Sequence, residues 1–175
     1  MATAMAKSLL LPLSALCLLA LVGCRASALP EKSPGSESEV LVPETLPAHL
    51  QEVFSVPSRT LVLTFFDLYC VPCQQSAPNF RALAQKVKDR GVREMTIRGI
   101  AHGNTELELE AYQERYQLPF ASVADPEESL EEILEIRGTP TVLVLRSTPE
   151  GWKEMVRHEG RLRDADLENL LAQLP

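Results

Sequence analysis

The pattern of hydrophobic and polar positions predicts a central strand followed by a long helix. Residues 61–66 form a nearly continuous apolar run, which is typical of a strand buried on both faces of a sheet. The strand is expected over residues 59–66, and the helix over residues 71–90, with Gly91 as its C-cap. One face of that helix carries apolar residues at helical spacing, namely Phe80, Leu83, Ala84 and Val87.

The same pattern predicts the remaining elements of an α/β domain. A short helix is expected between residues 46 and 56, and strands over residues 92–100, 120–123, 141–146 and 152–159. Asn104 and Asp164 are predicted to cap further helices, the first running to about Tyr116. Asp125, followed by Pro126 and two glutamates, predicts a helix that ends at Gly138. This order predicts a mixed β-sheet with helices on both faces.

The N-terminal segment has the features of a secretory signal. Lys7 precedes an apolar run over residues 8–22, which is shorter than the roughly 20 residues of a membrane-spanning helix. Residues 21–24, Leu-Val-Gly-Cys, resemble the bacterial lipobox. Residues 1–23 are therefore predicted to be a lipoprotein signal peptide and Cys24 the lipid-modified residue. The alternative is an ordinary signal peptide cut near Ala26 or Ala28.

Composition divides the rest of the chain into a tether and a domain. Residues 24–45 are predicted to be a flexible tether, because Pro, Ser, Gly and Glu dominate most of this segment. Residues 46–175 are predicted to be the folded domain. The formal net charge of −7 argues against nucleic acid as a partner, since that role requires a basic face.

The four cysteines indicate a redox pair. Cys17 would leave with the signal peptide and Cys24 would carry the lipid, so that only Cys70 and Cys73 remain as thiols. Their C-x-x-C spacing lies between the predicted strand and the predicted helix. The free N–H groups and dipole of a helix N-terminus stabilise an anion, so Cys70 is expected to be a nucleophilic thiolate. Cys73, one turn later, can close a disulfide with it.

These residues resemble the thioredoxin superfamily, and within it the periplasmic, membrane-tethered thiol–disulfide oxidoreductases of the TlpA/ResA-like group. The resemblance covers residues 61–175 and rests on the strand, the cysteine pair and the later Gly-Thr-Pro-Thr at residues 138–141. It implies a thioredoxin-like fold in which Pro140 follows a cis peptide bond. The backbone of Thr139 would then bind a partner strand. Apolar side chains would surround the sulfurs: Leu68, Tyr69, Val71 and Pro72.

The resemblance also implies the activity, the partners and the location. The chain is expected to act as a thiol–disulfide oxidoreductase, as a reductant, without a cofactor because the two cysteines hold the electrons. Its partners would be protein thiols and disulfides of the periplasm, such as apocytochrome c in the relatives, together with a membrane electron donor or acceptor. The expected location is the bacterial cell envelope, facing the periplasm on a lipid anchor.

The chain departs from the family's pattern at three positions near the cysteines in the sequence. Tyr69 stands where tryptophan is common, Thr64 where cytosolic thioredoxins place a buried aspartate, and Ser76 where many TlpA-like proteins have a glutamate. The usual proton acceptor for Cys73 is therefore missing. Asp67 is either a substitute for it or a solvated or capping residue.

The cysteine pair allows three other interpretations. A zinc site needs four ligands, but His49, His102 and His158 are isolated in the sequence from one another and from the pair. A copper-binding or metal-insertion module without redox turnover is the main alternative, because thiolates bind Cu(I). A purely structural disulfide would stabilise so small a loop only slightly. No metal site is predicted, and Trp152 and the acidic residues 127–135 are assigned to a strand and a solvated helix face.

Overall fold

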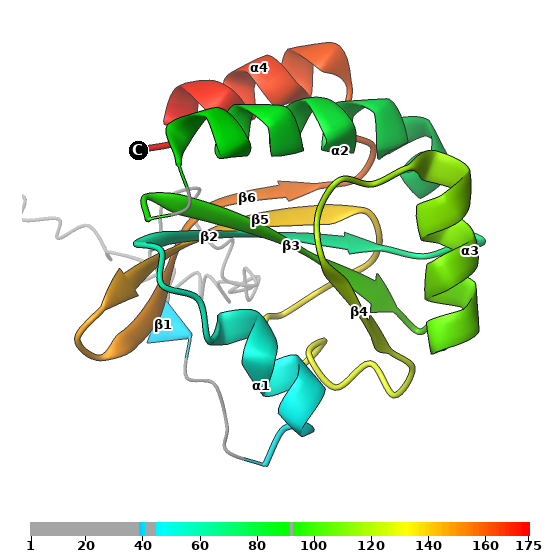
Figure 1. The fold of residues 1–175 in the computed structure, drawn as a ribbon, viewed down its shortest axis with the longest axis horizontal. Coiled ribbons are helices and arrows are strands. Elements are labelled where there is room, and N and C mark those ends of the chain that lie inside the picture. Colours follow the sequence, from blue (N-terminus) through cyan, green and yellow to red (C-terminus); the bar gives the residue numbers. More distant parts are fainter. Residues whose placement is uncertain (1–38, 41–44, 92) are drawn as a thin grey trace, which may run out of the picture. The chain divides into compact units, whose positions relative to one another are not determined.

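The computed structural model describes residues 39–40, 45–91 and 93–175, which are built on one mixed sheet (Figure 1). Within these residues the sheet has six strands in the order β1-β6-β5-β2-β3-β4. The central strand β2 pairs in parallel with β3 and antiparallel with β5. The strand bounds are β1 Glu39–Val40, β2 Thr60–Phe66, β3 Met95–His102, β4 Ser122–Asp125, β5 Thr141–Thr148 and β6 Gly151–Glu159.

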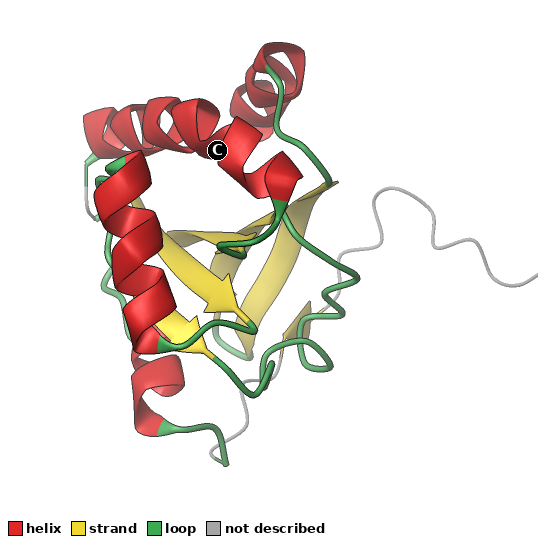
Figure 2. Ribbon diagram, turned by 90° about the vertical axis from the view of Figure 1, so that its right-hand side faces the viewer, coloured by secondary structure: helices red, strands yellow, loops and turns green. Residues whose placement is uncertain are grey.

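Helices cover both faces of this sheet, as the pattern predicted (Figures 1 and 2). Helices α2 and α4 lie over one face and α1 lies over the other. The helix bounds are α1 Ala48–Phe54, α2 Val71–Arg90, α3 Glu106–Tyr116 and α4 Asp164–Gln173. None of the helices in the described ranges combines the length and apolar character needed to cross a membrane.

The core has two halves that share strand β2. Val62 and Phe66 pack into the half formed with α2, α3 and α4, whereas Leu61 and Leu63 pack into the half formed with α1 and the segment after β4. Successive side chains of a strand point to opposite faces, so a strand covered on both sides must be apolar throughout. This explains the continuous apolar run and confirms the prediction for β2.

Helix α2 has the predicted bounds. It begins directly after Cys70, with a proline in its first turn, and ends at Arg90. Gly91 follows with φ of 89°, a left-handed conformation that favours glycine. The predicted strands at β3, β5 and β6 and the predicted helices at α1 and α4 are also present, with shifts of a few residues at their ends.

The helix predicted between Asp125 and Gly138 is wrong. Asp125 is the last residue of β4, and residues 126–137 form turns and irregular chain. The Asp125 carboxylate accepts hydrogen bonds from the N–H groups of Ser129 (2.8 Å) and Leu130 (3.0 Å), and so folds the following chain into a loop. Glu128 and Glu135 have positive φ values of 54° and 49°, which a right-handed helix does not allow. The acidic residues therefore lie on a loop and not on a helix face.

Two predicted caps are also wrong. Thr105, not Asn104, caps α3: its hydroxyl accepts from the Glu108 N–H while the Glu108 carboxylate accepts from the Thr105 N–H. Asp164 is the first residue of α4, and the Asp166 carboxylate accepts from the Arg163 N–H at 3.0 Å. In each case an acid in the first turn binds the backbone at the helix start.

The N-terminal predictions lie almost entirely outside the described residues. Residues 1–38 are not described, so the signal peptide, Cys24 and most of the predicted tether stay predictions. The exception is β1, which falls inside the segment predicted to be a tether. Glu39 pairs with Lys153 and Val40 with Trp152, which places the end of that segment on the edge of the sheet.

Candidate active site

Cys70 and Cys73 form a disulfide at the N-terminus of α2. Cys70 is the N-cap residue and is partly exposed, whereas Cys73 is fully buried beneath it. The Cys73 N–H points at the Cys70 Sγ with an N···S distance of 3.2 Å. The accessible sulfur therefore lies at the positive end of a 20-residue helix, where a thiolate is stabilised.

The loop that leads into Cys70 is fixed by a buried asparagine. The Asn104 amide donates to the Asp67 Oδ1 at 3.0 Å, and its Oδ1 accepts from the Leu68 N–H at 2.9 Å. The same Asp67 oxygen accepts from the Tyr69 N–H at 2.9 Å. The Asp67 carboxylate therefore binds the backbone of this loop, whereas the N-cap residue of α2 is Cys70. Asn104 braces the loop from the position directly before Thr105, the N-cap of α3.

The segment before β5 lies against the accessible sulfur. The Thr139–Pro140 peptide bond is cis, as the resemblance implied. The Thr139 carbonyl oxygen is 3.3 Å from the Cys70 Sγ, and the Pro140 carbonyl accepts from the Gly160 N–H at 2.8 Å. Thr139 is partly exposed while Pro140 is buried. The structure therefore brings Cys70 and Thr139 together, although the sequence separates them by 69 residues.

The two hydroxyls that replace the family's acids are bound to backbone groups. Thr64, fully buried on β2, donates to the Arg98 carbonyl at 3.3 Å. Ser76, fully buried on α2, donates to the Pro72 carbonyl at 2.7 Å and accepts from the Leu162 N–H at 2.9 Å. Ser76 thereby ties α2 to the chain before α4. Both residues stabilise the fold behind the cysteines.

Tyr112 is a site residue that the sequence reasoning missed. Its hydroxyl donates to the Cys73 carbonyl at 2.9 Å across 39 residues. Its ring is fully buried and stacks on Phe66 with centroids 4.5 Å apart. Burial raises the pKa of Tyr112 above its ordinary value of 10.0, so its phenol is a neutral donor at physiological pH.

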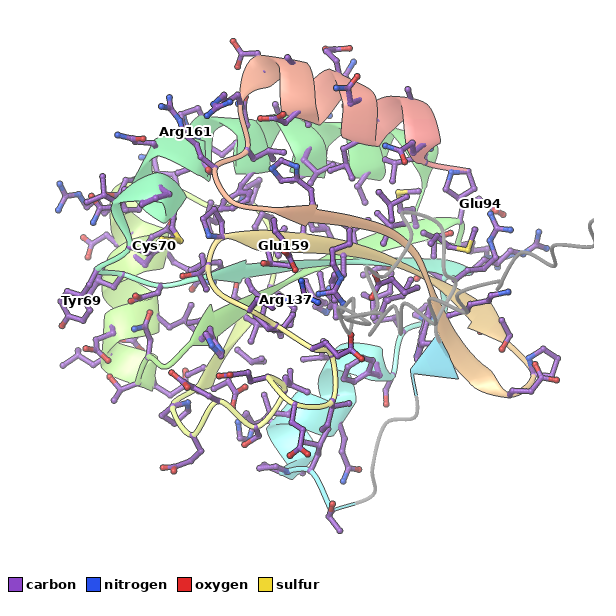
Figure 3. The ribbon with its side chains drawn as sticks, turned by 180° about the vertical axis from the view of Figure 1, so that it is seen from behind. Tyr69, Cys70, Glu94, Arg137, Glu159 and Arg161 are labelled. Atoms are coloured by element: carbon purple, nitrogen blue, oxygen red, sulfur yellow. A yellow bond between two sulfur atoms is a disulfide. The ribbon has the colours of Figure 1, made fainter. Side chains whose placement is uncertain are left out.

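Exposed apolar side chains flank Cys70. Tyr69 is 69% exposed and Val71 57% exposed, and Pro72 beside them is also exposed. The Tyr69 hydroxyl donates to the Glu108 Oε1 at 2.8 Å, which raises the pKa of Tyr69. Figure 3 shows Tyr69 and Cys70 together at one end of the molecule's described part. The predicted contact residues therefore lie on the surface around the accessible sulfur.

Metal-ligating side chains gather elsewhere. The His102 Nε2 is 3.6 Å from the Glu131 Oε2 and 4.0 Å from the Glu128 Oε1, a group able to approach one cation. The loop after β4 thus brings two glutamates to His102, but neither another histidine nor a cysteine belongs to this group of described residues. His49 and His158 instead contact backbone carbonyls of Ala124 and Arg161. No candidate metal group in the described ranges includes Cys70 or Cys73.

Comparison with known proteins gives a family for the chain and several relatives. The AhpC/TSA family model matches residues 48–150. Over 116 residues the chain is 25% identical to the thiol-disulfide oxidoreductase ResA of Halalkalibacterium halodurans, covering 66% of this chain. The match spans 64% of that relative's length, slightly less than two thirds.

Solved structures show the fold. A Chlorobium tepidum protein assigned as the thiol:disulfide interchange protein DsbE superposes with a TM-score of 0.57 at 23% identity, over 71% of this chain and 81% of that one. A thioredoxin-like superfamily protein superposes with a TM-score of 0.53 at 18% identity, over 81% of this chain and 95% of that one. The predicted thioredoxin-like fold is confirmed.

Proposed function

The chain belongs to the AhpC/TSA family, and on that premise we propose that it is a thiol–disulfide oxidoreductase that exchanges the Cys70–Cys73 pair with cysteines of extracytoplasmic proteins. One observation carries the proposal. A disulfide lies at the N-terminus of a helix with its outer sulfur accessible and its inner sulfur buried. A structural disulfide has no need of an accessible sulfur at the position that best stabilises a thiolate.

The exchange proceeds through a mixed disulfide. The Cys70 thiolate attacks one sulfur of a partner's disulfide, which breaks that bond and releases one partner thiolate. The Cys73 thiolate then attacks the Cys70 sulfur, closes the Cys70–Cys73 bond and releases the second partner thiolate. Two electrons pass from this chain to the partner, and the reverse sequence oxidises the partner. The residues hold the electrons themselves, so the step requires no cofactor.

The surroundings of Cys70 supply the docking surface. The Thr139 backbone, next to the Cys70 sulfur, is the natural place for an extended partner segment to form main-chain hydrogen bonds. Exposed Tyr69, Val71 and Pro72 would contact apolar side chains beside the partner's cysteine. The neutral Tyr112 hydroxyl and the Asn104 amide hold the backbone on either side of Cys70 in place.

The N-terminal sequence supports a location outside the cytoplasm. A signal peptide over residues 1–23 and a lipid on Cys24 would tether the domain to a membrane, facing the periplasm. There it would reduce protein disulfides, with apocytochrome c as one candidate substrate, and receive electrons from a membrane donor. The relative named ResA is described as a thiol-disulfide oxidoreductase, which supports the same reaction.

Insulin reduction by dithiothreitol tests the proposal. The full-length protein is expected to accelerate the reaction, and Cys70→Ser is expected to abolish the acceleration. A wild-type protein that gives no acceleration and binds Cu(I) tightly would instead support the copper-binding alternative. No specific contact favours that alternative, because the candidate metal group of the described residues contains neither cysteine.

A further inference from the structure

A second candidate site lies at the opposite end of the sheet from Cys70. An open cavity of about 890 Å³ is bounded by the chain before β2, the end of α2, the start of β3 and the end of β5. Strand β2 begins at this cavity with Thr60 and leads at its other end toward Cys70. Figure 3 shows Glu94, on the cavity wall, far from Cys70 across the ribbon. The cavity is therefore separate from the disulfide site.

The cavity has a basic lining in an acidic protein. Its charged side chains are Arg59, Arg90, Arg146 and Glu94. Arg90 donates to the Pro175 carbonyl at 2.5 Å. No ion pair within the described ranges includes Arg59 or Arg146. Among the described residues, the guanidinium groups of Arg59 and Arg146 thus form no ion pair with a carboxylate, although the chain carries a net charge of −7.

The sheet fixes the backbone of these two arginines side by side. The Ser147 N–H donates to the Arg59 carbonyl at 2.8 Å, and Arg146 pairs with Thr60 in the β2–β5 register. Arg59 lies in the bend directly before β2, and Arg146 lies on β5, so both come from the same end of the sheet. The hydrogen bond from Ser147 holds this bend against β5.

A buried hydroxyl on the same wall also lacks a partner. Ser58 lines the cavity, is only 4% exposed, and its Oγ has no hydrogen-bond partner in the described part of the chain. A buried polar group without a partner costs about 1–3 kcal/mol, so such groups are uncommon unless something else binds them. The Ser58 hydroxyl is thus a donor beside the cavity that the described part of the fold leaves unsatisfied.

We propose that this cavity binds a phosphate-class oxyanion. The planar guanidinium groups of Arg59 and Arg146 can each donate two parallel hydrogen bonds to phosphate oxygens. Helix α2 ends at the cavity, and its negative end does not attract an anion, so the arginine side chains supply the attraction. The apolar side chains of Val56, Pro57 and Met95 also line the cavity and would contact the organic part of a phosphate ester.

A phosphate group could come from a soluble ester or from a phospholipid headgroup. The edge strand β1 joins the sheet at this same end, because it pairs with Lys153, which in turn pairs with Arg146. The chain therefore enters the domain near the cavity. A headgroup bound there would hold this end at a membrane surface and leave Cys70 facing away from it.

Isothermal titration of the full-length protein in detergent micelles tests the site. Inorganic phosphate and glycerophosphoglycerol, a soluble lipid headgroup, serve as the two probes. We expect a Kd of about 1 mM or tighter for at least one probe. Arg59→Ala and Arg146→Ala should each weaken binding at least tenfold, and Ser58→Ala should weaken it without lowering the melting temperature of the free protein. Arg137→Ala, an exposed arginine elsewhere, is the matched control.

The results distinguish a soluble phosphate from a lipid headgroup as the ligand, and they also show whether the proposal fails. Tighter binding of glycerophosphoglycerol identifies the lipid headgroup, and tighter binding of inorganic phosphate identifies a soluble anion. Binding of neither probe overturns the proposal. Equal weakening by Arg137→Ala and Arg146→Ala overturns it as well, because the attraction would then be non-specific. None of these readouts depends on the activity of the cysteines.

Discussion

The Cys70 Sγ lies 3.3 Å from the carbonyl oxygen of Thr139. A disulfide sulfur has no proton to donate, so in the oxidised protein this is a contact between the two atoms. After reduction the Cys70 thiol can donate to the same oxygen, and a bound partner segment would compete for the Thr139 backbone. The contact thus joins the reacting sulfur to the place where a partner would bind.

The different exposure of the two cysteines predicts which variant traps a partner. Cys73→Ala leaves the accessible Cys70 without a resolving thiol, so a mixed disulfide between Cys70 and a peptide substrate should accumulate. Mass spectrometry under non-reducing conditions measures this adduct. Cys70→Ala is the control and should form none. Equal adduct formation by both variants would contradict the assignment of Cys70 as the nucleophile.

Asn104 should stabilise the fold through the loop before Cys70. Asn104→Ala removes the acceptor of the partly buried Leu68 N–H and the amide bound to Asp67, and we expect a loss of about 1–3 kcal/mol in the free energy of unfolding. The rate of insulin reduction should fall as well, because Cys70 would be held less firmly. Urea denaturation measures the stability. Asn169→Ala, at an exposed position of α4, should change neither quantity.

Tyr112 should make stability depend on pH in the alkaline range. Burial raises the pKa of Tyr112 in the folded protein, whereas an unfolded tyrosine ionises near its ordinary value of 10.0. The unfolded state therefore loses this proton first, so stability is retained below pH 10 and falls above it, by up to about 1.4 kcal/mol per pH unit. Tyr112→Phe should flatten this decline in urea denaturation between pH 9 and 11.

Tyr116→Phe is the matched control for Tyr112. The Tyr116 ring contacts Tyr112 in a tilted arrangement, with centroids 4.5 Å apart, but Tyr116 is only partly buried. The Tyr116→Phe variant should therefore keep most of the loss of folding stability seen above pH 10. If the two variants flatten the decline equally, the burial of Tyr112 is not its cause.

Asp125 should determine the shape of the acidic loop. Its carboxylate, 1% exposed, accepts from the N–H groups of Ser129 and Leu130. Asp125→Ala leaves both donors without this partner, and we expect a loss of about 1.5–3 kcal/mol in the free energy of unfolding. Glu127→Ala, exposed on the same loop, should lie within about 0.5 kcal/mol of the wild type.

The elements that the sequence predicted well are those with a strong local pattern. The apolar run of β2 and the apolar face of α2 follow directly from burial on the sheet, and Gly91 marks the helix end by its conformation. The cysteine pair could be placed because it lies between these two elements. Its approach to Thr139 rested on the family resemblance alone.

The features that the sequence missed depend on contacts between distant residues. Asp125 and the acids after it have the composition of a helix start, but the left-handed Glu128 and the buried Asp125 carboxylate form a loop instead. Asparagine is common at helix N-caps, yet the Asn104 side chain binds the loop before Cys70. The Tyr112 bond to the Cys73 carbonyl leaves no local signal, since 39 residues separate the partners.

The equilibrium between the Cys70–Cys73 disulfide and its dithiol tests the central claim most directly. The full-length protein, equilibrated in glutathione or dithiothreitol buffers and quenched with a thiol-alkylating reagent, is analysed by mass spectrometry. We predict reversible two-electron cycling, with a midpoint closer to the roughly −270 mV of a reductant such as thioredoxin than to the roughly −120 mV of an oxidant such as DsbA. A pair that stays oxidised across all buffers, or cycles by one electron, would contradict it.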